Sequence, residues 1–177
     1  MLREVTLQTR RIFEGKILNV RVDTVRTAKG GEATREVVEH RGAVAIVPLL
    51  EDGKVVLVRQ FRQAVGEVLL EIPAGTLNRG ENPEECARRE LVEEIGYEPM
   101  RLEKMFSSYL APGYSSELLH VFLATELRAA EGCTDEDETV VSEVMPLDEA
   151  VKMIRTGGIK DAKTICGLLL AADWGAR

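Results

Sequence analysis

One helix constrains the fold and chemistry of this chain more than any other stretch of its sequence. Its start combines Asn82 as N-cap, Pro83 at the first helical position and Glu85 three residues after the cap, and Gly96 marks its end. The pattern predicts a helix over Pro83–Ile95. Three apolar residues share one side of it: Ala87, Leu91 and Ile95. Such a stripe is typical of a helix that packs on a sheet.

The other side of this helix is acidic. At about 100° per residue, Glu90 and Glu94 lie about 40° apart around the helix axis, and Glu93 lies about 60° further round. Carboxylates held this close raise one another's pKa values unless a cation lies between them. Magnesium binds through a few carboxylates together with substrate phosphates. The alternative, judged from the helix alone, is a solvated glutamate-rich face.

The segments around the helix read mostly as strands. Ala43–Leu50 is almost continuously apolar, as in a strand buried on both faces, and Val55–Arg59 follows after an Asp52-Gly53 turn. Leu69–Pro73 is a short apolar stretch, and we expect a loop at Pro73-Ala74-Gly75. The remaining expected strands are Leu102–Tyr109, Leu118–Ala124 and Val140–Val144, and the remaining helices are Leu147–Arg155 and Ala162–Trp174, the latter capped by Asp161. This mixture indicates an α/β or α+β fold.

The first forty residues read as a small sheet of their own. Alternating apolar positions predict strands over Glu4–Phe13, Lys16–Thr27 and Ala33–His40, joined by glycine-containing turns. Three antiparallel strands make a poor core alone, so this sheet must pack on the rest of the chain or on a second copy. We therefore divide the chain into a sheet at residues 1–41 and a larger domain at 42–177.

Charge and cysteine content exclude several classes of protein. The net charge is −7, and residues 81–98 alone hold seven glutamates against two arginines. A chain this acidic has no general electrostatic reason to bind nucleic acid or an anionic membrane. No apolar run approaches the length of a membrane span, and the first eleven residues lack the apolar stretch of a secretory signal. Three scattered cysteines argue against a disulfide framework and favour a reducing cytoplasm.

The full spacing around the helix is more specific than the helix alone. Gly75 is followed after five residues by Glu81, and after seven more by Arg89-Glu90-Leu91-Val92-Glu93-Glu94-Ile95-Gly96-Tyr97. This pattern resembles the signature of the Nudix hydrolases, with only Tyr97 departing mildly from the usual aliphatic residue. The resemblance implies an α/β/α sandwich with a mixed sheet, in addition to the N-terminal three-stranded antiparallel sheet.

The resemblance also implies metal-dependent hydrolysis of a nucleoside diphosphate linked to another group. By position, Glu90 and Glu94 are the main metal ligands together with the main-chain carbonyl of Ala74, and Glu93 is a further ligand or a partner of one. Arg89 would orient Glu93 by a charge-assisted hydrogen bond. The implied cofactor is Mg²⁺, or Mn²⁺ or another divalent cation, with two or more ions per site.

Short motifs outside this signature resemble the ADP-ribose pyrophosphatase subgroup. They include Pro112, which falls 15 residues after Tyr97, and the stretches around Arg35, Arg62 and Glu71. The subgroup carries an extra N-terminal sheet exchanged between the subunits of a homodimer.

The same resemblance suggests substrate contacts. Arg35 and Arg62 would contact the diphosphate or a ribose, and the alternative for each is a plain surface arginine. Phe13 would stack on adenine, in its own site or the partner's, or would pack in the core. Ala111, Pro112, Gly113 and Glu117 would hold the terminal ribose, unless Pro112 is only a rigid turn.

The acidic run at residues 135–138 has two interpretations. Such runs are usually solvated and mobile. The resemblance makes Glu136 the general base and Glu138 a further metal contact brought in by loop closure, and the two roles are interchangeable.

The sequence thus predicts a magnesium-dependent enzyme that cleaves ADP-ribose to AMP and ribose 5-phosphate. One alternative is the same chemistry on another nucleotide sugar, a dinucleotide or a nucleoside triphosphate. A more remote one is a Nudix module that senses ADP-ribose without cleaving it.

Overall fold

The computed structural model describes residues 2–130 and 139–174. The chain divides into two compact units. The smaller contains the residues up to Gly42 together with Ser108–Leu119, and the larger contains Ala43–Ser107 and the residues from His120 onward. This division differs from the one drawn at residue 41 in that it groups residues 108–119 with the N-terminal sheet.

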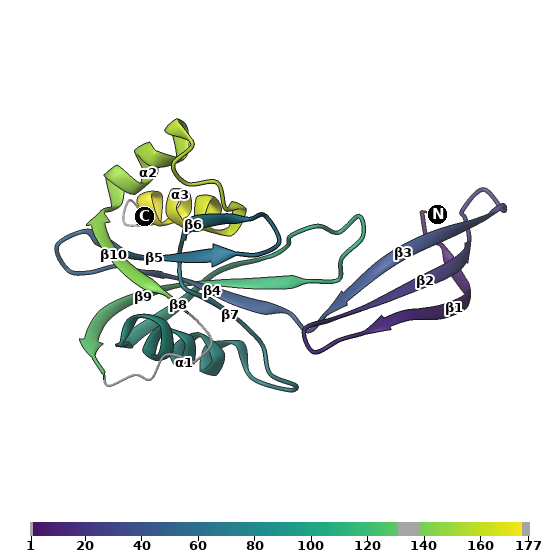
Figure 1. The fold of residues 1–177 in the computed structure, drawn as a ribbon, viewed down its shortest axis with the longest axis horizontal. Helices are drawn as coiled ribbons and strands as arrows, with labels where there is room; N and C mark the ends of the chain where they lie inside the picture. Colours follow the sequence, from purple (N-terminus) through teal and green to yellow (C-terminus); the bar gives the residue numbers. More distant parts are fainter. Residues whose placement is uncertain (1, 131–138, 175–177) are drawn as a thin grey trace. The chain divides into compact units, whose positions relative to one another are not determined.

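The smaller unit is built on a three-stranded antiparallel sheet in the order β1-β2-β3, as predicted (Figure 1). The strands are β1 (Val5–Glu14), β2 (Leu18–Arg26) and β3 (Glu32–His40). Every residue of β1 is exposed, because β1 is an edge strand and the unit is too small to cover it. The main chain near Tyr114 runs along β3, where Val38 N–H donates to the Tyr114 carbonyl (2.7 Å).

The larger unit contains two sheets. One has four strands in the order β7-β4-β9-β8 and the other three in the order β10-β5-β6. Their bounds are β4 (Ala43–Pro48), β5 (Lys54–Arg62), β6 (Glu67–Glu71), β7 (Ala74–Thr76), β8 (Tyr97–Tyr109), β9 (Leu118–Ala129) and β10 (Val141–Pro146). The helices are α1 (Pro83–Ile95), α2 (Leu147–Thr156) and α3 (Ala162–Trp174).

Strand β4 lies between helices on both of its faces, which explains its continuous apolar sequence. All six of its residues are buried. Val44 and Ile46 belong to the core cluster of α1, whereas Val47 lies against Gly167 of α3. Because successive side chains of a strand point to opposite faces, β4 supports α1 on one side and α3 on the other. The predicted α/β/α arrangement is confirmed (Figure 1).

One sequence expectation is wrong. Residues 74–76 are the short strand β7, which pairs antiparallel with β4 through Ala45 and Ala74, instead of a loop. Proline and glycine indicate turns locally, but here the small residues of β7 fit beside a buried strand that supplies the hydrogen bonds. Several other strands are longer than predicted; β8, for example, begins directly after Gly96. Among the described residues, no helix has the length and apolar character needed to cross a membrane.

Candidate active site

Helix α1 forms where the sequence predicts it, with both ends capped. Asn82 Oδ1 accepts a hydrogen bond from the main-chain N–H of Glu84 (2.8 Å), and Gly96 ends the helix in the left-handed conformation at φ 69°. The apolar side of α1 packs in a core cluster. That cluster consists of Val44, Ile46, Leu77, Cys86, Ala87, Leu91, Phe122 and Ala124, with Ile95 against it. The helix is thus fixed on the sheet and cannot rotate its acidic side away.

Arg89 organises the carboxylates on this acidic side. Its guanidinium donates from Nε and Nη2 to the two carboxylate oxygens of Glu81 (3.0 and 3.3 Å), and from Nη1 to Glu93 (2.7 Å). The same Nη1 lies 2.8 Å from Glu90 Oε1. The predicted pairing of Arg89 with Glu93 is confirmed, and Glu81 has a partner that sequence reasoning did not assign.

These contacts shift the pKa values of both partners. The hydrogen bonds with Glu81 are the largest cause that raises the pKa of Arg89, and the same bonds lower the pKa of Glu81. Glu81 therefore stays ionised well below neutral pH. Three glutamates of the signature share one permanent cation, which offsets the repulsion expected between them.

Glu90 and Glu94 face the main chain that enters β7. A Cβ placed on Gly75 would lie 1.9 Å from the carboxyl carbon of Glu90, so only glycine leaves room for this close approach. The main-chain N–H of Ala74 donates to Glu94 Oε2 (3.1 Å), and Glu94 is only 9% exposed. The structure thus brings Glu90 and Glu94 to residues 74–75, whereas Glu93 contacts Arg89; the role of all four as metal ligands stays a prediction.

The donor set at this position suits a hard divalent cation. The donors are the carboxylate oxygens of Glu90 and Glu94 and the main chain of residues 74–75. Glu90 lies close to Gly75, and Glu94 contacts Ala74. Within residues 2–130 and 139–174, no group of three or more His, Cys, Asp or Glu side chains is arranged to hold a metal ion by itself. The reason is geometric: Arg89 holds Glu90 and Glu93, and Glu94 is turned to Ala74. A cation here needs the main-chain carbonyl, or further acids, to complete its ligands.

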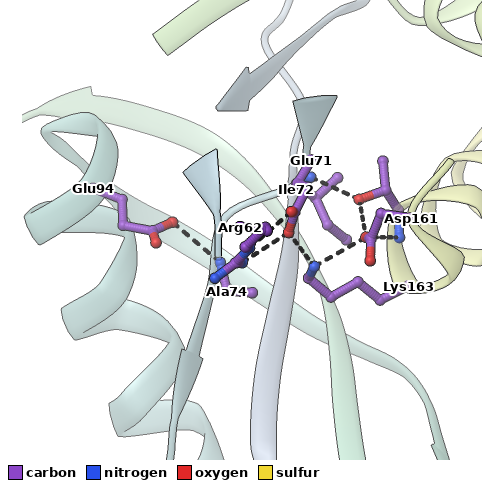
Figure 2. A network of polar contacts seen from close by, with 8 residues as sticks. Arg62, Glu71, Ile72, Ala74, Glu94, Asp161 and Lys163 are labelled. Atoms are coloured by element: carbon purple, nitrogen blue, oxygen red, sulfur yellow. Dashed lines mark hydrogen bonds and ion pairs between the residues drawn. The ribbon is translucent and has the colours of Figure 1, made fainter. Parts of the chain in front are cut away.

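Arg62, predicted to contact substrate, lies in an ion pair at the end of β5. Its Nε and Nη2 donate to the two carboxylate oxygens of Glu71 (2.9 and 2.8 Å), as Figure 2 shows. This hydrogen bonding raises the pKa of Arg62. Burial on its own raises the pKa of Glu71, but the bonds from Arg62 and the charge of Lys163 outweigh it, so the pKa lies below its usual value.

Glu71 and Lys163 are site neighbours to which sequence reasoning gave no role. Glu71 is 1% exposed and bonds to both Arg62 and Lys163. The signal was present in the sequence: a glutamate directly follows the apolar run Val68-Leu69-Leu70, and a charge at the end of a buried strand needs a partner. The partner, Lys163, lies 92 residues away, which no local pattern indicates.

The other predicted substrate contacts lie in the smaller unit. Arg35 pairs with Glu4 (Nε to Oε2, 3.0 Å), and that hydrogen bond raises its pKa. Phe13 is 55% exposed, with its ring over Gly15, so the core-packing alternative is wrong and stacking stays a prediction. Residues 111–115 form a turn closed by Ser115 N–H on the Ala111 carbonyl (2.8 Å).

The remaining predicted site residues are Glu117, Pro112, Gly113, Glu136 and Glu138. Glu117 Oε1 lies 3.8 Å from His40 Nδ1. Pro112 and Gly113 belong to the turn at residues 111–115. Glu136 and Glu138, the candidate base and additional metal contact, lie outside the described residues.

Cys86 is a packing residue. It is fully buried on α1, and burial raises the pKa of its thiol to about 12. Its sulfur accepts from Arg89 Nη2 at 3.3 Å. It therefore supports the orientation of Arg89 and is protonated at neutral pH.

Comparison with known proteins agrees with this geometry. A family model described as "NUDIX domain" matches residues 39–167, and one described as "Nucleoside diphosphate sugar hydrolase N-terminal domain" matches residues 4–38. The chain is 41% identical over 165 residues to an ADP-ribose pyrophosphatase of Bacillus subtilis, covering 92% of this chain and 89% of that protein. It is 38% identical over 167 residues to a methanol dehydrogenase activator of Bacillus methanolicus, covering 93% and 90%.

A solved structure supports the fold independently. A crystal structure titled as an ADP compounds hydrolase superposes with a TM-score of 0.86 over 97% of this chain and 94% of that one, at 23% sequence identity. The fold, the spacing of the glutamates on α1 and the matched family models agree. This chain belongs to the Nudix hydrolase family.

Proposed function

We propose that this protein hydrolyses the pyrophosphate of ADP-ribose to AMP and ribose 5-phosphate with a divalent cation, Mg²⁺ in the cell. The observation that carries the proposal is the placement of Glu90 and Glu94 against residues 74–75, with Arg89 holding the flanking carboxylates. The substrate assignment is supported by the 41% identity to an ADP-ribose pyrophosphatase over nearly the whole chain. The complete set of signature glutamates favours an enzyme over a module that only senses ADP-ribose.

The metal site that we propose uses Glu90, Glu94 and the main-chain carbonyl of Ala74, with Glu93 and Glu138 as further contacts. These residues would hold two or more divalent cations, which would supply charge neutralisation of the diphosphate and a lowered pKa of bound water. Arg89 pairs with Glu90 and Glu93 and would keep both carboxylates on the side of α1 where the cations bind. Glu136 would take the proton of the attacking water, with Glu138 as the alternative base.

The substrate contacts that we propose are those that the resemblance suggests. Arg62 and Arg35 would hold the diphosphate or a ribose as forked donors. Phe13, exposed with its ring over Gly15, would stack on adenine. Ala111, Pro112, Gly113 and Glu117 would hold the terminal ribose.

We also infer that the protein acts as a homodimer. The sheet of residues 1–41, which we treat as the exchanged domain, leaves large apolar side chains of its first strand exposed, including Val5, Leu7 and Ile12. A face of this sheet carries a hollow of about 500 Å³. It is lined by Arg10, Ile12, Val20, Val22, Glu36, Val37, Val38 and Tyr114. A second copy of the sheet would cover these apolar residues, and light scattering in solution measures the resulting mass.

Free thiols support a cytoplasmic location. Cys86 and Cys166 are both free cysteines. Reduced thiols are typical of a reducing compartment.

The matched N-terminal domain model favours a second candidate, another nucleoside diphosphate sugar. The test is a panel of ADP-ribose, GDP-mannose, a dinucleoside diphosphate and a nucleoside triphosphate at equal concentration with Mg²⁺. We expect the highest kcat/KM for ADP-ribose, with AMP and ribose 5-phosphate as products by chromatography. Preference for the triphosphate would contradict the proposal, and preference for GDP-mannose would favour the second candidate.

A further inference from the structure

A cluster of polar residues, of which Glu71 and Thr164 are buried and the others partly buried, joins the end of β6 to the start of α3. We call it the Glu71 cluster; it consists of Arg62, Glu71, Asp161, Lys163 and Thr164 (Figure 2). Glu71 lies at its centre, 1% exposed, and receives hydrogen bonds from both Arg62 and Lys163. A buried carboxylate is retained only with strong partners, because its desolvation is costly. The proposed reaction gives Glu71, Asp161, Lys163 and Thr164 no direct part.

The first turn of α3 supplies the rest of the cluster. Asp161 Oδ2 accepts from the main-chain N–H of Thr164 (3.0 Å), from the Thr164 hydroxyl (2.6 Å) and from Lys163 Nζ (2.9 Å). The Thr164 hydroxyl oxygen in turn accepts from the main-chain N–H of Ile72 (2.9 Å). Thr164 is fully buried. The first turn of α3, through Asp161 and Thr164, therefore holds the main chain of Ile72.

The same stretch of main chain leads directly to Ala74, which contacts Glu94. The Pro73 carbonyl accepts from the main-chain N–H of Ile46 (2.9 Å). The N–H of the next residue, Ala74, donates to Glu94. Proline also fixes one of the two soft dihedrals of its residue. Residues 71–74 are thus held by α3 at one end and by Glu94 of α1 at the other, as Figure 2 shows.

We propose that Lys163, through Glu71, and Thr164, through Ile72, are positioning residues that fix the main chain at residues 71–74, so that the Ala74 carbonyl and Glu94 present one cation site. This inference rests on the proposed function, because it takes that cation site from it. Lys163 and Thr164 touch neither substrate nor cation. Their effect is on the geometry of the oxygen ligands, to which Mg²⁺ is sensitive since it demands near-ideal octahedral coordination.

The test is direct binding of Mn²⁺ in the absence of substrate, measured by the electron paramagnetic resonance signal of the free ion. Lys163→Met removes the charge and keeps most of the side-chain length. We expect it to weaken Mn²⁺ binding about tenfold, the lower end of the loss seen when a residue outside the ligand set that supports a metal site is changed. Lys163→Arg should restore most of the affinity. In activity assays, saturating Mn²⁺ should recover kcat for Lys163→Met, while the KM for ADP-ribose stays unchanged.

Lys160→Met is the matched control. Lys160 pairs with Glu67 of β6 at 2.6 Å, at the same junction, but both side chains are more than half exposed. Its Mn²⁺ affinity should equal that of the wild type. Thermal unfolding is measured for every variant to show that it folds. If Lys163→Met does not fold, Thr164→Val tests the inference instead. It removes only the hydroxyl, which accepts from Ile72 N–H and donates to Asp161. We expect that variant also to weaken Mn²⁺ binding.

Two outcomes separate this inference from the proposed function. Wild-type protein that binds no Mn²⁺ would overturn the cation site and the inference together. If the wild type binds Mn²⁺ and the folded Lys163→Met variant, or Thr164→Val in its place, binds it with the same affinity, the inference alone would be overturned.

Discussion

Two arginine–carboxylate clusters of the larger unit are built in opposite ways. Arg89 and its partners Glu81, Glu90 and Glu93 lie within one helix and the loop before it, and the farthest pair is eight residues apart. The Glu71 cluster joins residues up to 92 apart, and its central carboxylate is almost fully buried. The first cluster shapes the acidic face of α1. The second holds the main chain that this face meets.

The difference shows that the acidic face of α1 is determined by local sequence, whereas the residues that position the main chain are brought together only by tertiary packing. A local cluster follows from helical spacing, because residues three and four apart are neighbours on any helix. A long-range cluster follows from packing, because its partners meet only once the sheet and α3 have formed. Variants in the first should change activity with little effect on folding, and variants in the second should change stability.

The largest expected effect is that of Glu94→Gln. The glutamine keeps an oxygen for the N–H of Ala74 but loses the charge needed by a divalent cation. Since a bound cation supplies several kcal/mol of transition-state stabilisation, we expect kcat to fall about 1000-fold at saturating Mg²⁺, with unchanged circular dichroism. Glu84→Gln, in the exposed first turn of the same helix, is the control. Near-normal turnover of Glu94→Gln would contradict its role as a ligand.

The Glu71 cluster should show its effect in stability. Glu71→Gln leaves Arg62 and Lys163 without their shared carboxylate, so the free energy of unfolding in urea should fall by about 3 kcal/mol at pH 7. The folded-state pKa of Glu71 lies below the ordinary 4.5. Its stabilisation is therefore complete above that value and is lost as the pH falls through the lowered pKa.

A pH series of urea titrations checks this sign. The gap between wild type and Glu71→Gln should close in acid, whereas Glu67→Gln, which removes the partner of the exposed Lys160, should show little gap at any pH. A gap that widened on acidification would show that Glu71 is not held ionised by its partners.

The smallest effect should come from Arg89→Lys, which keeps the positive charge and loses the planar set of guanidinium donors. A lysine cannot donate to both oxygens of Glu81 and also to Glu93, so we expect kcat/KM to fall about tenfold. Arg88→Lys is the neighbour control, because Arg88 donates instead to the Pro99 carbonyl. If both variants kept full activity, charge alone would suffice at position 89.

Local spacing and apolar periodicity predicted α1 with both of its ends, the acidic residues on its face and a mixture of strands and helices. The α/β/α arrangement followed from the resemblance to the Nudix hydrolases. The sequence did not predict strand β7 or the role of Glu71. Pro73 and Gly75 carry the local signature of a turn, and only the neighbouring β4 makes strand pairing favourable there. Lys163 is an ordinary helix residue in sequence, and only the packing of α3 brings it to Glu71.

The close contact at Gly75 also limits how this site can change over time. Every other amino acid carries a Cβ, and a Cβ at this position would occupy the space of the Glu90 carboxyl group. The clash would fall on the end of a flexible side chain, so a replacement at position 75 would displace the Glu90 carboxyl group before it disturbed the strand. We therefore expect a change at this residue to move Glu90, one of the proposed cation ligands, away from residues 74–75.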